Sequence, residues 1–256
     1  MIRAAFFDMD GTLISHRLHD VPQSARVALT ELRSRGVKVF AATGRHVLEL
    51  QRLPVWEIPM DGYVTLNGQL CLDGRGEPFY SKTVQAEDEK EIVDLFCAGE
   101  VPVKLIQRDR IYINRVNGDV CRTQADISTP VPEVEDYEGG PIYQLVLYAD
   151  EPTAGPVRER LKHCRATRWG RTALDVFPAD GGKAAGIQKT LQRYGLSREE
   201  IIAFGDGEND ADMLAYAGLG VAMGNAVEAL KARADYVTAP VDEDGIWLAL
   251  RHFGAL

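Results

Sequence analysis

Short apolar segments alternate with segments of helical periodicity toward both ends of this chain, and this alternation limits the fold more than any other feature. The segments that we predict as strands are AAFF (residues 4–7), VKVFAAT (37–43), YVTL (63–66), IIAFG (201–205), GVAM (220–223) and a short one around Tyr236. Helices are predicted between them; two end at Gly36 and Gly195, and another begins at Asn225. Strands that alternate with helices form a parallel sheet with both faces covered. The predicted fold class is therefore α/β, with a doubly wound, Rossmann-like parallel sheet.

Residues 83–177 follow a different pattern. We predict there a helix over 87–97, a hairpin of two strands (103–107 and 111–116), a loop rich in Pro, Glu and Gly over 117–141, a strand over 142–148, a helix over 157–164 and strands near Ala166 and Ala173. The order helix, strand, strand occurs about twice, which indicates a separate mixed α/β module. The sequence therefore predicts two domains, with residues 1–82 and 178–256 forming the parallel domain and residues 83–177 inserted into it.

The composition is that of a globular protein, with 45% hydrophobic and 26% charged residues. No apolar run is long enough to span a membrane and the N-terminus lacks the apolar segment of a signal peptide, so we expect a cytoplasmic protein. A net charge of -9 disfavours a nucleic-acid partner, because a phosphate backbone requires a basic surface. The 4 cysteines lie far apart without a CxxC pair, which disfavours a zinc or redox site. The expected partner is a small molecule, and the sequence indicates no oligomeric state.

Polar residues follow four of the predicted strands. They are Asp8 and Asp10 after the first strand, Thr43, Gly44 and Arg45 after the second, Asn67 and Gly68 after the third, and GDGEND (205–210) after IIAF. In a doubly wound sheet, ligands bind beyond the carboxyl ends of the strands. We therefore expect these side chains to converge at one edge of the sheet. Lys183, at the start of the helix before IIAF, could reach the same place.

The acids of this set predict a metal site. Asp8, Asp10, Asp206 and Asp210 would repel one another strongly unless a cation lay among them. Oxygen ligands with no nearby His or Cys favour Mg²⁺. A Mg²⁺ ion beside a hydroxyl and an ammonium group, here from Thr43 and Lys183, makes a site for a phosphoryl group. One aspartate could then attack phosphorus while its neighbour handles protons.

These motifs resemble those of the haloacid dehalogenase superfamily of phosphatases. They are DMDGT (8–12), Thr43 within TGR, Lys183 within DGGKAAGI, and GDGEND (205–210), in the family's order. The inserted module, together with NGQL, GVAMGNA and EDGIWLAL, is similar to the Cof-type branch, which carries a C2B-type cap. Any one motif alone is weak, whereas four in order are specific. The resemblance covers essentially the whole chain and implies a catalytic core with an inserted α/β cap domain.

The resemblance implies a Mg²⁺-dependent phosphomonoester hydrolase that acts on small sugar phosphates or related metabolites. By it, Asp8 is the nucleophile that becomes an aspartyl-phosphate, and Asp10 protonates the leaving alcohol and then activates water. It also implies that Mg²⁺ is bound by Asp8, the backbone carbonyl of Asp10 and Asp206, that the phosphoryl oxygens are bound by Thr43, Gly44, Lys183 and Asn209, and that Asp210 orients the metal, its waters or Lys183.

Other interpretations of the same residues are open. A phosphomutase of the same superfamily would share the first motif and the cap, and a non-enzymatic regulator could bind a phosphorylated metabolite with this site. Taken singly, an acidic turn, a lysine at a helix start or an Asn-Gly turn at Asn67 is ordinary structure. The segment GLGVAMG (218–224) does not fit a dinucleotide-binding fingerprint, because its third glycine comes one residue late.

Three features depart from the family pattern or receive no role. Gly182 precedes Lys183 where family members commonly have Ser, Asn or Asp, so a supporting hydrogen bond is expected to be missing. His16 and His19 lie in a variable region after the first motif and are not assigned. The inserted module is locally basic, and some of its arginines could meet an anionic substrate. They are Arg108, Arg110, Arg115, Arg122, Arg165, Arg168 and Arg171.

Overall fold

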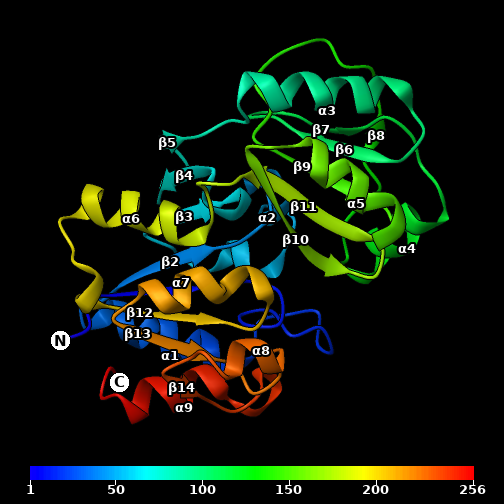
Figure 1. The fold of residues 1–256 in the computed structure, drawn as a ribbon. Helices are drawn as coiled ribbons and strands as arrows, with labels where there is room; N and C mark the ends of the chain where they lie inside the picture. The colour runs from blue at the N-terminus through cyan, green and yellow to red at the C-terminus, as the bar shows by residue number, and fades with distance from the viewer. The chain divides into compact units, whose positions relative to one another are not determined.

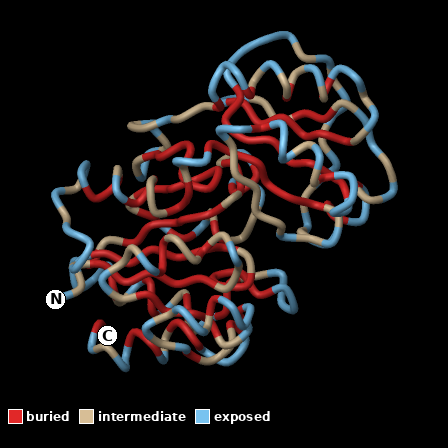
Figure 2. The backbone as a smooth tube through the Cα atoms, viewed as in Figure 1, coloured by how far each residue is buried: buried red, intermediate tan, exposed pale blue.

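The computed structural model describes residues 1–256, which form two compact units. The first, called the core unit below, joins Met1–Ser81 to Gly182–Leu256, and the second unit is Lys82–Gly181. The inner strands of both units are buried, whereas exposed residues gather on edge strands, on loops and on the outer sides of helices (Figure 2). No helix combines the length and the apolar character that crossing a membrane requires.

The core unit is built on one eight-stranded sheet with the order β14-β13-β12-β1-β2-β3-β4-β5 (Figure 1). The strands are β1 (Ala4–Phe7), β2 (Lys38–Ala42), β3 (Gly62–Thr65), β4 (Leu70–Asp73), β5 (Pro78–Ser81), β12 (Ile201–Gly205), β13 (Leu219–Ala222) and β14 (Tyr236–Val237). All pairs from β14 to β3 are parallel, which confirms the predicted doubly wound α/β sheet. The last two strands, β4 and β5, are antiparallel additions that the sequence did not predict.

Helices cover both faces of this sheet. They are α1 (Gln23–Ser34), α2 (Val47–Leu50), α6 (Lys183–Tyr194), α7 (Ala211–Tyr216), α8 (Glu228–Lys231) and α9 (Gly245–His252). On one face, α6 and α7 pack together against the strands, and on the other α1 packs with α9 (Figure 1). The central strand β1 is completely buried, with Phe6 stacked on Phe40 and Phe7 stacked on Phe204. A strand packed on both faces holds the residues at its carboxyl end rigidly.

The second unit contains a six-stranded sheet with the order β10-β11-β9-β6-β7-β8. Its elements are α3 (Ala86–Ala98), β6 (Val103–Ile106), β7 (Ile111–Ile113), α4 (Gly118–Asp126), β8 (Glu133–Val134), β9 (Gln144–Tyr148), α5 (Glu151–Arg160), β10 (Cys164–Gly170) and β11 (Ala173–Pro178). Most strand pairs are antiparallel, and only β7 and β8 pair in parallel. Apolar side chains of α3 and α5 form a core with one face of the sheet, including Ile92, Leu145 and Val176.

Three local predictions were wrong. Residues 117–141, predicted as a loop, contain α4, because the side chain of Asn117 caps the helix by accepting the backbone N–H of Val120. The helix predicted over 157–164 begins at Glu151 and ends at Arg160; Asp150 caps its first turn, where a proline is tolerated. The helix predicted from Asn225 begins three residues later, at Glu228, because the Asn225 amide bonds the backbone of Gly11 and Val241 instead.

Candidate active site

The first acidic motif lies where β1 ends. Asp8 follows the strand directly and is 7% exposed, and the chain then turns at Gly11, whose φ is +81°. A left-handed φ favours glycine. A Cβ atom at Gly11 would also lie 2.3 Å from Oδ2 of Asp206, so only glycine allows the two segments to approach this closely.

Lys183 lies between two carboxylates at the start of α6. Its side chain is 0% exposed, and Nζ lies 2.6 Å from Oδ1 of Asp8 and 2.5 Å from Oδ1 of Asp210. The preceding Gly182 has a φ of +114°, and its carbonyl oxygen would be 2.0 Å from a Cβ atom at Gly68. Glycine therefore suits the backbone before Lys183, which gives a physical reason for the departure from the family pattern at this position.

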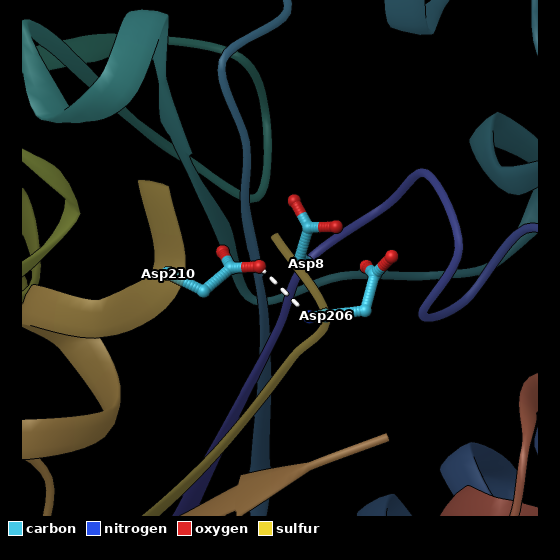
Figure 3. A group of neighbouring side chains, drawn as sticks. All are labelled: Asp8, Asp206 and Asp210. Carbon is cyan, nitrogen blue, oxygen red and sulfur yellow. Dashed lines mark hydrogen bonds between the residues drawn. The ribbon is translucent and has the colours of Figure 1, made fainter. Parts of the chain in front are cut away.

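Asp206 and Asp210 follow β12 and use their carboxylates differently. Both oxygens of Asp210 are engaged, because Oδ1 accepts from Lys183 and Oδ2 accepts the backbone N–H groups of Asp206 and Gly207 at 2.9 and 2.8 Å. Asp206 accepts a hydrogen bond from the Thr12 hydroxyl through Oδ1, at 2.8 Å. Figure 3 shows Asp8, Asp206 and Asp210 grouped where their strands end, with the bond from Asp210 to the Asp206 backbone dashed.

The charges of this group are poorly balanced. Burial, and then repulsion by Asp210, hold the pKa of Asp8 well above its ordinary value, although Lys183 opposes the rise. Burial and the same neighbour raise the pKa of Asp206 to about 7. Burial alone would lower the pKa of Lys183, but Asp210 and Asp8 outweigh burial and raise it. Carboxylates that resist ionisation in this way favour a bound cation beside them.

The donor atoms of the group suit a hard divalent cation. One carboxylate oxygen from each of Asp8, Asp206 and Asp210 lies within 4.8 Å of the other two. All three donors are oxygen, which magnesium and calcium prefer. Since Asp210 already uses both oxygens within the protein, Asp8 and Asp206 are the side chains that fit a metal ion best.

Other residues expected at the site lie at neighbouring strand ends. Thr43 and Gly44 follow β2, and the buried Thr43 hydroxyl accepts the backbone N–H of Arg45 at 3.1 Å. Asn209 donates a hydrogen bond to the side chain of Asn67 at 3.2 Å. Asn67 is buried in a left-handed conformation, as the Asn-Gly turn predicts. His16 and His19 lie on an exposed turn after the first motif.

Comparisons with known proteins match this architecture over its whole length. Residues 5–250 match the family of haloacid dehalogenase-like hydrolases. The chain belongs to this family. It is 35% identical to the 5-amino-6-(5-phospho-D-ribitylamino)uracil phosphatase YitU of Bacillus subtilis (strain 168), over 97% of this chain and 96% of that protein.

Solved structures of haloacid dehalogenase phosphatases agree closely with this fold. BT1666 from Bacteroides thetaiotaomicron superposes with a TM-score of 0.91 at 36% identity, covering 100% of this chain and 96% of that one. The subclass IIB sugar phosphatase BT4131 superposes with a TM-score of 0.90 at 34% identity, covering 99% and 100%. These findings confirm a Cof-type member of the superfamily and an enzyme of the phosphatase class.

One residue, Arg45, was expected from the sequence at this edge of the sheet but was given no role there. Arg45 forms a bidentate ion pair with Asp10, with Nε 2.6 Å from Oδ2 and Nη2 2.7 Å from Oδ1. The motif TGR alone carries little information, and the pair joins residues far apart in the chain. The sequence contained only an indirect signal for this ion pair. A charged residue that follows β2 lies beside an acid that follows β1 when the two strands pair in parallel.

Two arginines of the second unit are engaged within that unit. Arg110 pairs with Glu135 and with Glu138, at 3.2 Å for the latter, and lies over the ring of Tyr112. Arg168 pairs with Glu151 at 3.1 Å and donates to two backbone carbonyls. Both arginines therefore have partners within the unit, and their contact with an anionic substrate stays a prediction.

Proposed function

We propose that this hydrolase is a Mg²⁺-dependent phosphomonoesterase that acts through an aspartyl-phosphate on small phosphorylated metabolites such as sugar phosphates. The observation that carries the proposal is the carboxylate of Asp8 at the end of β1, which Lys183 contacts through Oδ1 beside the acid Asp206. The names of the relatives support the substrate class, because one acts on a phosphorylated ribityl compound and another is a sugar phosphatase.

In the first half of the reaction, Asp8 attacks the phosphorus atom of the ester. Lys183 holds Oδ1, so Oδ2 is the oxygen that forms the new bond. The bond from phosphorus to the ester oxygen breaks, its electron pair stays on that oxygen, and Asp10 supplies the proton that makes it an alcohol. Thr43, Gly44, Lys183 and Asn209 are proposed to bind the other phosphoryl oxygens.

In the second half, water attacks the phosphorus atom of the aspartyl-phosphate. Asp10, now ionised, takes a proton from the water, and the bond between phosphorus and the Asp8 oxygen breaks. Its electron pair returns to the Asp8 carboxylate, and inorganic phosphate leaves. Asp210 contributes by orientation, since its two oxygens hold Lys183 and the backbone of Asp206 and Gly207 in place.

Asp8, the backbone carbonyl of Asp10 and Asp206 would hold the metal ion. Bound there, Mg²⁺ would offset the negative charge of the phosphoryl group and of the carboxylates around it. The raised pKa of Asp206, about 7, and the all-oxygen donor set both fit such an ion.

The test of the proposed function is a screen of phosphorylated metabolites with Mg²⁺, measured as released phosphate. We expect hydrolysis of several sugar phosphates and loss of that hydrolysis in EDTA. An absence of phosphate release from every ester with Mg²⁺ present would overturn the proposal.

The metal assignment predicts a specific defect in Asp206→Ala. Because Asp206 would supply a carboxylate without covalent chemistry, the variant should bind Mg²⁺ at least about 10-fold more weakly and turn over almost no substrate. Calorimetry of Mg²⁺ binding and phosphate release measure the two effects. Glu208→Ala is the matched control, because Glu208 lies in the same loop but is exposed. Full activity of Asp206→Ala in EDTA would contradict the assignment.

We propose that the second unit acts as a cap that selects the leaving group. The face of its sheet opposite the apolar core carries one row of four residues, of which three are polar: Lys104 pairs in register with Val146, Val146 with Asp175, and Asp175 with Thr167. Lys104 and Asp175 are both buried, and Trp169 donates its indole N–H to Asp175 at 2.8 Å. Carboxylate, hydroxyl and ammonium groups of this kind recognise hydroxyl-rich ligands by hydrogen bonding.

This proposal predicts a change of specificity without a change of chemistry. Lys104→Gln and Asp175→Asn should shift the ratio of kcat/KM between two sugar phosphates by about 10-fold or more, because a lost buried hydrogen bond is costly. Hydrolysis of acetyl phosphate, which has almost no leaving group to select, should change much less. Equal losses on every substrate would argue against a selective role for this face.

A further inference from the structure

The ion pair between Arg45 and Asp10 has no part in the steps derived above. Both oxygens of the Asp10 carboxylate accept from the guanidinium, at 2.6 and 2.7 Å. The Arg45 side chain is only 9% exposed, whereas that of Asp10 is 31% exposed. The pair therefore consists of a buried, fixed cation and a partly accessible carboxylate.

A bidentate contact of this kind fixes the plane of the carboxylate. The guanidinium is planar and its N–H groups diverge at fixed angles, so a carboxylate bound through both oxygens cannot rotate about its Cβ–Cγ bond without losing a contact. An ionised carboxylate has about four lone-pair sites, of which Arg45 uses two. The remaining sites can still accept a proton or a hydrogen bond while the orientation is held.

We propose that Arg45 is a positioning residue, which holds the Asp10 carboxylate in the orientation needed to take a proton from the water that hydrolyses the aspartyl-phosphate. The inference rests on the proposed function, since it requires an aspartyl-phosphate on Asp8. In that step the water oxygen bonds to phosphorus, the bond from phosphorus to the Asp8 oxygen breaks with its electron pair left on Asp8, and the proton moves to Asp10. Arg45 keeps its own protons and its charge throughout.

The competing role for Arg45 is direct binding of the substrate phosphate. The two roles differ in which kinetic constant they change. A positioning residue acts through Asp10, so its loss slows the proton-dependent half-reaction and leaves substrate affinity nearly unchanged. A phosphate ligand acts on the substrate itself, so its loss raises KM whether or not Asp10 is present.

The experiment compares Arg45→Met and Arg45→Lys with Asp10→Asn and with the double variant Asp10→Asn/Arg45→Met. Rapid mixing with p-nitrophenyl phosphate separates the formation of the aspartyl-phosphate from its hydrolysis. Nitrophenolate leaves without a proton, whereas hydrolysis of the aspartyl-phosphate needs a base. Arg35→Met is the matched control, since Arg35 also pairs with a carboxylate, that of Glu31, but on the exposed side of α1. Thermal melting of each variant establishes that it is folded before kinetics are measured.

We expect Arg45→Met to give a burst of nitrophenolate near one equivalent, followed by steady turnover about 10 to 100-fold slower than that of the native protein, with kcat/KM within about 3-fold. Asp10→Asn should show the same burst, and adding Arg45→Met to it should slow turnover by less than about 3-fold further, because interacting residues are not additive. Arg45→Lys, which keeps the charge and one contact, should recover part of the rate.

Three results would overturn the inference: a rise in KM without a burst, equal slowing of both half-reactions in a folded Arg45→Met variant, or effects of the two substitutions that multiply in the double variant. Failure of the proposed function looks different, because the native protein would then form no phosphorylated Asp8 with any ester. If Arg45→Met does not fold, the same test is made by comparing Arg45→Lys and Asp10→Asn with the double variant Asp10→Asn/Arg45→Lys.

Discussion

Asp8→Asn removes essentially all turnover, on activated and unactivated esters alike. An amide oxygen is a poor nucleophile, so no covalent phosphoryl-enzyme can form and neither half-reaction proceeds. Loss of the nucleophile in enzymes of this kind leaves only the small rate supplied by binding and electrostatics. The measurements are phosphate release in the steady state, and the mass of the Asp8 peptide after rapid quenching with substrate, which should show phosphorylation of the native protein alone.

The same substitution should leave the metal-free fold intact or make it more stable. Burial and repulsion raise the pKa of Asp8, so its negative charge at neutral pH weakens folding, and an uncharged amide of the same shape removes that cost. Enzymes commonly retain a buried charged group that lowers the stability of the fold because their activity requires it. Asp73→Asn is the control, because Asp73 lies in the same unit and accepts only backbone N–H groups of a turn. Phosphorylation at Asp8→Asn, or normal turnover by that variant, would exclude Asp8 as nucleophile.

The parallel sheet and the positions of the acids could be predicted because both depend on local sequence. A strand buried on both faces is apolar along its length, as in β1, and the first polar residues after it must lie at its carboxyl end. The arrangement of Asp8, Asp206 and Lys183 follows from two such ends and a helix start, together with the order of the motifs.

The remaining details depend on contacts between distant residues. Arg45 and Asp10 are 35 positions apart in the sequence. Several charged residues follow the strands, and side-chain packing across two strands decides which of them form pairs. Asn225 has the residue type of a helix cap, but its amide bonds the backbone of Gly11, 214 positions away. Such contacts take precedence over a local capping signal, and the sequence pattern does not contain them.

The second prediction with a large effect concerns stability rather than chemistry. Lys183→Met removes the only cation that contacts Asp8 and Asp210 in the described structure and leaves two carboxylates buried together. Breaking a buried ion pair by removing one partner costs about 3 to 5 kcal/mol in free energy of unfolding, because the remaining charge is uncompensated. Activity should be lost as well, since Oδ1 of Asp8 would no longer be held. Lys189→Met is the control, because Lys189 is a half-buried lysine of the same helix that lies over the ring of Tyr80 and forms no ion pair with a carboxylate.

The loss of stability should depend on pH in a defined direction. Lys183 lowers the pKa of Asp8, so without it that pKa rises further above the unfolded value of about 4. A carboxyl whose folded pKa is raised weakens folding progressively as the pH increases from its unfolded pKa to its folded pKa. Urea unfolding should therefore show a larger deficit for Lys183→Met at pH 8 than at pH 5. The triple variant Lys183→Met/Asp8→Asn/Asp210→Asn, in which none of the three charges of this ion-pair cluster remains, should recover most of the stability at pH 8. Equal deficits at both pH values, or no recovery in the triple variant, would show that Lys183 stabilises the fold by packing rather than by charge.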